Sequence, residues 1–212
     1  MLKQVVTAIL LLSFVLILSF VYVDLMEKKH LRNDIDFIIS TLNNQEEALN
    51  IREKAASALK KIGGPAVKPL AFLLRNGDPY ARRNAAFALG EVGNKDAAAY
   101  LVAASRDDNS RVRYNAIVAL RKTGYKHPVG PLIEALKDES ASVRMETAYF
   151  LGEIGNNNAV EALINLLKDE NWGVREEVYV ALKKITQEDF GRSYDNWSKW
   201  LEMKKNDKKE GK

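Results

Sequence analysis

The chain has 212 residues, a net charge of +4 and 47% hydrophobic residues, an ordinary composition for one globular domain with an appendage. It contains no cysteine, which excludes disulfide frameworks, thiolate zinc sites and cysteine nucleophiles. Because His30 and His127 are its two histidines, a metal centre built from several imidazoles is not expected. The small positive charge does not by itself indicate a class of partner.

Residues 5–23 form an uncharged apolar run without glycine or proline. A helix of this length spans about 28 Å, close to the hydrocarbon core of a bilayer at about 30 Å. The sequence therefore predicts a single-pass N-terminal transmembrane anchor over residues 1–23 and a membrane localisation. The rival interpretation is a cleaved signal peptide, whose apolar region is usually shorter, about 7–15 residues. Cleavage stays open, and the flanking charges do not resolve the side of the membrane.

Beyond this run, a pattern of 31 residues repeats along the chain. Val-Arg pairs begin at Val112, Val143 and Val174, and rows of leucine and glycine keep the same spacing, except that the first unit is one residue shorter. The rows are Leu59, Leu89, Leu120, Leu151 and Leu182; Leu70, Leu101, Leu132 and Leu163; and Gly63, Gly93, Gly124 and Gly155. Several rows in phase over four or five units indicate a repeat architecture.

Each unit has the pattern of two helices. After Arg113, the apolar residues Ala116, Ala119 and Leu120 follow at helical spacing, and Gly124 then ends the helix. The second helix of this unit carries Val129, Leu132, Ile133 and Leu136. One such pair cannot bury its own apolar face, so the units are expected to stack. The prediction is an all-α, right-handed α-solenoid of about five helix pairs over residues 46–186, preceded by one transmembrane helix.

The ends of the repeat region depart from the pattern, as the caps of a solenoid do. Residues 24–45 are predicted as a linker and N-terminal capping helix. Thr186 stands in place of the glycine of the last unit. Residues 187–203 are predicted as a C-terminal capping helix, begun by Asp195, with Trp197, Trp200 and Leu201 on one face. The alternative for these aromatic residues is a ligand platform. Residues 204–212 are predicted as a disordered basic tail.

The segments Leu-Gly-Glu-Val-Gly at 89–93 and Leu-Gly-Glu-Ile-Gly at 151–155, with the Val-Arg starts, resemble HEAT repeats of the phycobilisome-lyase type. The resemblance covers about residues 46–186. It implies that an Asp pairs with an Arg six residues later where each loop enters a helix, and that these pairs hold the loops. The matching pairs are Asp107 with Arg113, Asp138 with Arg144 and Asp169 with Arg175. The second unit departs, with Asn76 in the place of the Asp and Asp78 nearby.

The resembled family includes enzymes. Deoxyhypusine hydroxylase holds two irons through His-Glu pairs, whereas Leu31 and Pro128 follow the histidines here, so this activity is not expected. No single short motif excludes the bilin lyases and isomerases. The chain also lacks the glycine-rich phosphate-binding motifs GxxxxGK[ST] and GxGxxG. We therefore assign no catalytic, cofactor-binding or metal-binding residue.

Two rows of charge recur with the repeat. Arg75, Arg106, Lys137 and Lys168 stand 31 residues apart at the expected ends of the second helices, and they form a candidate partner-binding rim. The alternative is that these cations complement the helix dipoles. In the second row, the basic pairs at 60–61, 121–122 and 183–184 alternate with Glu91 and Glu153. Stacking would bring these opposite charges together, which favours mutual compensation.

The resulting hypothesis is a membrane-anchored HEAT-repeat scaffold that mediates protein–protein interaction and is not an enzyme. The alternative is an enzyme or enzyme subunit related to bilin lyases or to HEAT-repeat metal oxygenases. Nucleic acid is not an expected partner, because its binding needs a denser basic patch. The identity of the protein partner and any self-association stay open.

Overall fold

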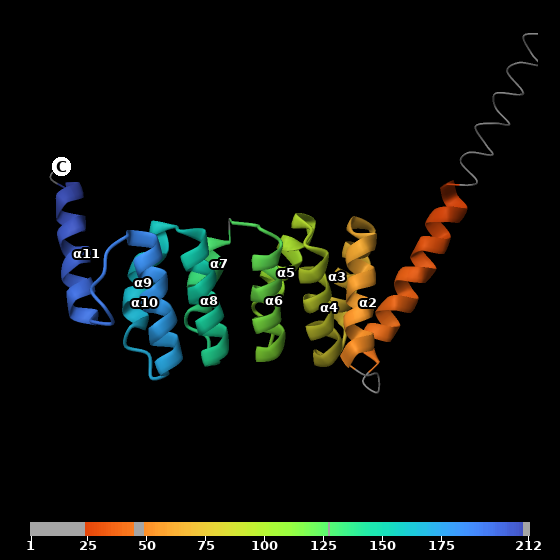
Figure 1. Ribbon diagram of the computed structural model, residues 1–212, viewed down its shortest axis with the longest axis horizontal. Coiled ribbons are helices and arrows are strands. Elements are labelled where there is room, and N and C mark those ends of the chain that lie inside the picture. Colours follow the sequence, from red (N-terminus) through yellow and green to blue (C-terminus); the bar gives the residue numbers. More distant parts are fainter. Residues whose placement is uncertain (1–23, 45–48, 127, 210–212) are drawn as a thin grey trace, which may run out of the picture. The chain divides into compact units, whose positions relative to one another are not determined.

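The computed structural model describes residues 24–44, 49–126 and 128–209, and its contacts divide the chain into two units, Met1–Ala55 and Ala56–Lys212 (Figure 1). In the first unit a helix runs over residues 24–43, where the sequence predicts the N-terminal capping helix. Within the described ranges, no helix is both long enough and apolar enough to cross a bilayer. The predicted anchor over residues 1–23 lies outside these ranges.

From α2 onward, the chain alternates between first and second helices of successive repeats. The first helices are α2 (Leu49–Ile62), α4 (Pro79–Val92), α6 (Ser110–Lys122), α8 (Ala141–Ile154) and α10 (Trp172–Thr186). The second helices are α3 (Val67–Asn76), α5 (Ala98–Ala104), α7 (Val129–Ala135) and α9 (Val160–Leu166), followed by the terminal α11 (Tyr194–Lys209). Short 3-10 turns precede three of the second helices, at Gly64–Ala66, Lys95–Ala97 and Asn157–Ala159. The part of the chain that the structure describes contains no strand, and in the second unit the first helices stack side by side (Figure 1).

Local chemistry sets where these helices begin and end. Asp78 caps α4 by accepting a hydrogen bond of 2.8 Å from the Ala81 amide, and Asn171 caps α10 through the Val174 amide. The glycines of the predicted row all have a positive φ, and Gly93 and Gly155 adopt the left-handed conformation that ends a first helix, with φ values of 66° and 70°. In the last unit this conformation falls on Gln187 and not on Thr186, because a β-branched residue disfavours positive φ. The first helix of this unit, α10, therefore includes Thr186 and ends before Gln187.

The core of the stack is the double row of leucines that the sequence predicts. Every leucine of both rows is at most 1% exposed. Alanines fill the spaces between neighbouring first helices, for example Ala85, Ala88 and Ala116, all fully buried. Each repeat therefore completes the core of the next, which confirms the predicted all-α solenoid of stacked helix pairs.

The first helices do not pack uniformly, because one position in the repeat alternates between glycine and a long cation. A Cβ atom added at Gly90 would lie 2.8 Å from the Ala119 Cα, and one added at Gly152 would lie 2.9 Å from the Ala181 Cα. These glycines let α4 pack tightly against α6, and α8 against α10. Arg121 takes the same position in α6, and the contact between α6 and α8 is looser.

The boundary between α6 and α8, which we call the polar seam, is filled by charged side chains. Arg121 Nε donates to Glu146 Oε1 at 2.9 Å, and its Nη1 lies 3.7 Å from Glu153 Oε2. The guanidinium also lies over the ring of Tyr149, 5.0 Å from its centroid. On the boundary between α4 and α6, Lys122 forms an ion pair with Glu91. The predicted compensation of charges along the stack is confirmed at both boundaries.

The terminal helix α11 packs against α9 and closes the stack. Trp197 is fully buried, meets Phe190 edge to face at 5.0 Å and donates its indole N–H to the Gly191 carbonyl at 2.8 Å. Trp197 is therefore part of the packing of the terminal helix and is not available to a ligand. Ser193, rather than Asp195, precedes the helix and accepts from the Asn196 amide at 3.3 Å.

The prediction of a disordered tail from residue 204 was wrong for residues 204–209, because α11 continues to Lys209. The buried Trp197 fixes the first turns of α11, and the helix can extend from them. The residues that follow are good helix formers: Glu202, Met203, Lys204 and Lys205. Lys205 also pairs with Glu161 of α9 at 2.9 Å. A charged composition was therefore not a sign of disorder here.

Candidate protein-binding face

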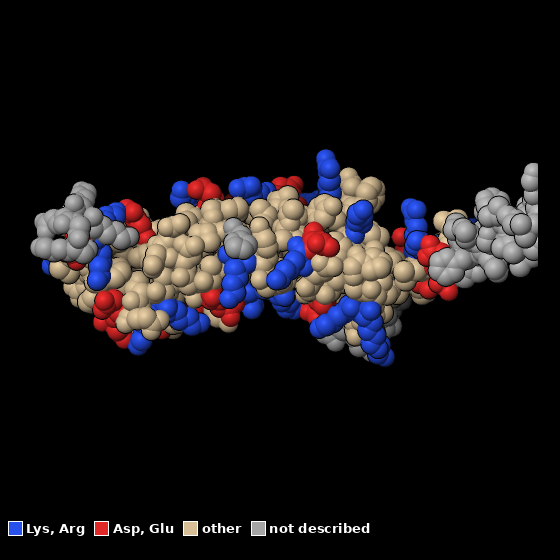
Figure 2. All heavy atoms as spheres, turned by 90° about the horizontal axis from the view of Figure 1, so that it is seen from above, with Lys and Arg blue, Asp and Glu red and all other residues tan. Residues whose placement is uncertain are grey.

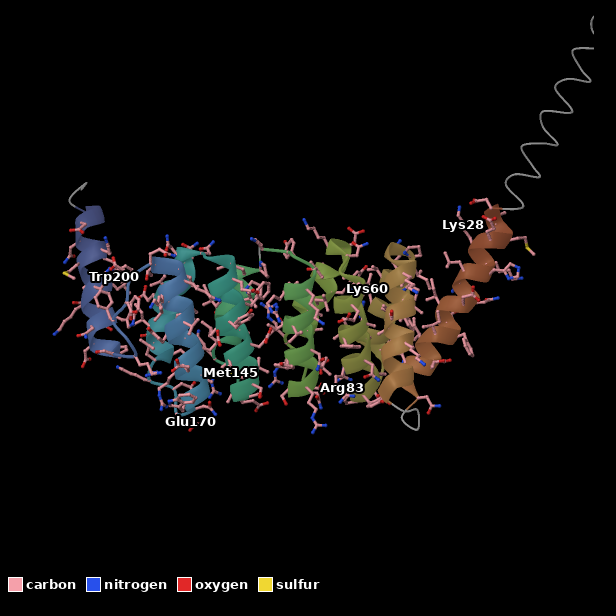
Figure 3. All side chains as sticks on the ribbon, viewed as in Figure 1. Lys28, Lys60, Arg83, Met145, Glu170 and Trp200 are labelled. Atoms are coloured by element: carbon pink, nitrogen blue, oxygen red, sulfur yellow. The ribbon has the colours of Figure 1, made fainter. Side chains whose placement is uncertain are left out.

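The loops that lead from second to first helices are joined by a ladder of ion pairs between consecutive repeats. In each rung an arginine near the start of a first helix makes two hydrogen bonds to an aspartate in the next loop, 25 residues later. The rungs are Arg82–Asp107, Arg113–Asp138 and Arg144–Asp169, with donor–acceptor distances of 2.6–2.8 Å. Arg83 and Glu170, which neighbour the first and last rungs in sequence, lie at the same edge of the stack (Figure 3).

The ladder corrects the pairing implied by the family resemblance. Arg113 does reach Asp107, six residues before it, but it does so by donating from Nη1 to the main-chain carbonyl at 2.9 Å. The carboxylate of Asp107 belongs instead to Arg82 of the preceding repeat. Each Asp carboxylate also accepts from the amide two residues later, as Asp107 does from Asn109 at 2.9 Å, and this turn directs it to the preceding repeat.

The rungs stay ionised because their hydrogen bonds outweigh the cost of burial. Burial alone raises the pKa of the Asp107 carboxyl, but the bonds from Arg82 and the Asn109 amide hold that pKa below its usual value. The same causes, burial opposed by Arg144 and the Asn171 amide, leave the pKa of Asp169 lowered. The hydrogen bond to Asp138 raises the pKa of the Arg113 guanidinium. The ladder is therefore a structural element and not a proton donor.

The predicted rim lies at the C-terminal ends of the second helices, beside the ladder. All four of its cations are exposed, but they differ in their partners. Lys168 lies over the Tyr194 ring of α11 at 3.3 Å, and Lys137 lies 3.8 Å from Glu134. Arg75 and Arg106 have no ion pair with any side chain that the structure describes. The free positive charge of the rim is thus concentrated at α3 and α5.

A groove of about 870 Å³ runs between α3 and α5, next to these two arginines. Four alanines and the buried Leu74 line it, together with two aromatic side chains: Phe72 from α3 is 71% exposed and Tyr100 from α5 is 44% exposed. Lys68 and Arg75 line the α3 side. We call this the α3/α5 groove, and its combination of exposed aromatic and basic side chains is typical of a binding surface.

A second groove of about 780 Å³ lies between α7 and α9, and its chemistry is different. Glu161, Asn158 and Asn165 line it, together with Asp169 and Glu170 of the last loop. No exposed aromatic residue lines this α7/α9 groove. The two grooves therefore differ: the α3/α5 groove presents exposed aromatic and basic side chains, whereas the α7/α9 groove is lined by aliphatic and amide side chains and by charges of both signs.

The sequence interpretation missed Phe72 and Tyr100. The signal was available in the repeat itself, since the positions of Phe72 in later units are Ala103, Glu134 and Asn165. A large aromatic residue at a solvent-facing position that is small or polar elsewhere marks one repeat as different.

Among the described residues, no three His, Asp or Glu side chains gather so that they could hold a metal ion. His30 is exposed on the helix over 24–43, and His127 lies outside the described residues. On the face drawn in Figure 2, basic and acidic side chains are interspersed along the margins of an uncharged strip. This distribution is unlike the dense basic patch of a nucleic-acid interface.

The repeat region matches the family model of HEAT repeats twice, over residues 67–130 and 129–191. The chain belongs to the HEAT-repeat family. No curated protein sequence matches it significantly.

Solved structures extend this assignment. The complex of CpcE and CpcF of phycocyanin lyase from Nostoc sp. PCC7120 is 26% identical, with a TM-score of 0.57 over 73% of this chain and 65% of that chain. YibA of Escherichia coli is 24% identical, with a TM-score of 0.59 over 78% of this chain and 65% of that one. A designed armadillo repeat protein in complex with the peptide (KR)4 is 19% identical, with a TM-score of 0.51 over 70% and 80%. The first likeness agrees with HEAT repeats of the phycobilisome-lyase type.

Proposed function

We propose that this HEAT-repeat protein is a membrane-anchored scaffold that binds a protein partner on its second-helix face. The observation that carries the proposal is the α3/α5 groove, where Phe72 and Tyr100 are exposed on facing helices. Large aromatic side chains exposed beside a concave, alanine-lined surface are costly to leave in water and are a common feature of protein-binding sites. The basic rim beside the groove supports the same face.

Photo-crosslinking in the native host tests this proposal. A benzoylphenylalanine residue at position 106 is expected to give one discrete protein adduct, while the same residue at the exposed Lys199 of α11 gives none. Charge reversal of Arg106 and Lys137 together is expected to weaken capture of the same partner, and reversal of the exposed Lys199 and Lys204 is not. Equal labelling from both crosslinker positions, or unchanged capture by a folded rim variant, would contradict the assignment of this face.

The anchor is supported by the apolar run over residues 5–23, whose length matches a bilayer. The full chain is expected to stay with the membrane pellet during alkaline carbonate extraction, and a chain without residues 1–23 is expected to leave it. Protease accessibility in sealed vesicles then assigns the side of the membrane. Release of the full chain by carbonate would show that the run is not an anchor.

A second candidate, a subunit of a bilin lyase, is favoured by the likeness to the CpcE–CpcF complex. It predicts that the full chain purified from its host carries a coloured ligand or remains bound to a second HEAT-repeat chain. The absorbance spectrum and mass of the purified material separate this candidate from the scaffold. A colourless preparation that still crosslinks from position 106 supports the scaffold.

A further inference from the structure

We propose that the α3/α5 groove binds an acidic amphipathic segment of a partner protein. The inference rests on the proposed function and specifies the chemistry of the partner. It follows from three properties of the groove: its apolar surface, its uncompensated positive charge and its dimensions.

The apolar surface comes from both helices. Phe72 projects from α3 and Tyr100 from α5, and Leu74 and four alanines also line the groove. Small lining residues beside two large aromatic side chains leave room for apolar side chains of a ligand. The other groove of the same face lacks this arrangement, so the property belongs to one site and not to the repeat in general.

The charge around the groove is positive because its acidic residue is already neutralised. Lys68 and Arg75 line the α3 wall, and neither has an ion pair with a described side chain. Asp107 also lines the groove, but both of its oxygens are bound by Arg82. Arg106, exposed beside Asp107, adds a further cation. An acidic ligand therefore meets unpaired cations, whereas a basic ligand would meet repulsion without compensation.

The dimensions suit a short helix or strand. The helix α3 has 10 residues, which corresponds to a wall of about 15 Å, or about three helical turns. A ligand helix of this length places about three apolar residues on one face. Its acidic residues then lie on the flanks, toward Lys68, Arg75 and Arg106.

Other occupants fit the charge less well. The apolar run over residues 5–23 of this chain carries no acidic residue, so it offers nothing to the cations. A second copy could present its α7/α9 groove, but the large apolar side chains there, Ile133, Leu136 and Leu166, are at most partly exposed, and cations line that groove beside its carboxylates. Binding of a second copy remains a distinguishable outcome of the experiment.

Peptide selection on the full chain in mild non-ionic detergent tests the proposal. Random peptides of about 16 residues, or about four helical turns, are displayed and selected on the parent chain and on the variant Phe72→Ser/Tyr100→Ser. We expect the parent to enrich peptides with net negative charge and large apolar residues, and the variant not to enrich them. A dye-labelled peptide from the selection then measures affinity by fluorescence anisotropy.

In that assay Phe72→Ser is expected to raise Kd about tenfold or more, as the loss of an aromatic hot spot does. Arg75→Glu is expected to raise Kd and reduce its dependence on salt. The matched controls are Phe37→Ser, whose side chain is equally exposed at 72%, and Lys199→Glu, an exposed cation of α11 that lines neither groove. Neither control should change Kd, and circular dichroism verifies that each variant is folded.

Selection of basic or uncharged peptides, no enrichment at all, or binding that Phe72→Ser leaves unchanged would each overturn the inference. Self-association of the full chain that Phe72→Ser abolishes would identify a second copy as the occupant and overturn it as well. The crosslinking from position 106 distinguishes these failures from failure of the scaffold: a partner that still crosslinks while the groove binds no acidic peptide contradicts the inference alone.

Discussion

The guanidinium of Arg113 binds the carboxylate of Asp138 through two hydrogen bonds of 2.6 and 2.8 Å across the boundary between two repeats. The side chains of this pair are only 10% and 8% exposed, so neither charge is well solvated without the other. Arg113 also donates to the carbonyls of Asp107 and Asp108 in the loop of its own repeat. One side chain thus joins two loops, and the ladder repeats this connection along the stack.

Removing a member of a rung should therefore be costly. Arg113→Ala leaves the buried Asp138 carboxylate unpaired and is expected to lower the free energy of unfolding by about 3 kcal/mol. The matched control is Arg175→Ala, because Arg175 binds the carbonyls of Asp169 and Glu170 but pairs with no described carboxylate. Its expected cost is about 1 kcal/mol. Urea unfolding followed by circular dichroism measures both, and equal losses would contradict the ladder.

The ladder also predicts loss of stability in acid. The pKa of Asp107 and that of Asp169 lie below their usual values in the folded chain, so protonation is harder there than in the unfolded chain. Their contribution is fully present above the unfolded pKa of about 3.9 and is lost as the pH falls through the lower, folded pKa. The free energy of unfolding should therefore fall below about pH 4. Asp107→Asn should be less stable than the parent at pH 7, and the two should converge in acid; a constant difference would contradict this assignment.

The close approach of α4 and α6 predicts an unusual response to alanine. Gly90→Ala places a Cβ 2.8 Å from the Ala119 Cα, and separating the helices is expected to cost about 1–3 kcal/mol. This exceeds the gain of about 1 kcal/mol from better helix propensity. Gly130→Ala in α7 is the control, since its Cβ would meet no atom within 4 Å. The control should be neutral or stabilising, and a Gly90→Ala protein as stable as the control would refute the close packing.

Removing the negative charge of Glu177 on α10 is expected to stabilise the protein. Burial raises the pKa of its carboxyl, Lys184 opposes this rise, and Glu146 on α8 adds to it. A carboxyl whose folded pKa is raised destabilises the protein above that pKa and ceases to do so as the pH falls through it. Glu177→Gln should therefore raise the thermal midpoint at pH 7, by up to about 3 °C, with no gain below about pH 4. Glu176→Gln, which removes a partner of Arg192, should give no gain.

Periodicity predicts most of the fold, because the same residues that repeat in sequence are those that touch in the core. Leu89, Leu120 and Leu151 keep one spacing and are all buried in neighbouring first helices. The ends were harder to predict, because no repeat fixes them. The helical residues 204–209 have a composition that also suits disorder, and only their packing beyond Trp197 decides between the two.

The site was less predictable for two physical reasons. A repeat of 31 residues with an Asp six residues before each Arg also places each Arg 25 residues before the next Asp, so the sequence contains both pairings. The hydrogen bond from the Asn109 amide to the Asp107 carboxylate favours the pairing with Arg82, and this bond becomes visible only in the folded structure. The sequence places the rim residues at the ends of second helices, but it does not show that Lys168 lies against the Tyr194 ring, a contact that depends on the packing of α11.

The polar seam at Arg121 has a consequence for mechanics. Tight glycine contacts hold α4 to α6 and α8 to α10, whereas the contact between α6 and α8 is looser and includes the charged side chains of Arg121 and Glu146. Denaturant or force should therefore separate the array into two cooperative blocks at this point, rather than peel it repeat by repeat from its ends. The α3/α5 groove belongs to one block and the α7/α9 groove to the other. Bending at Arg121 therefore changes the angle between the two grooves while each keeps its own shape.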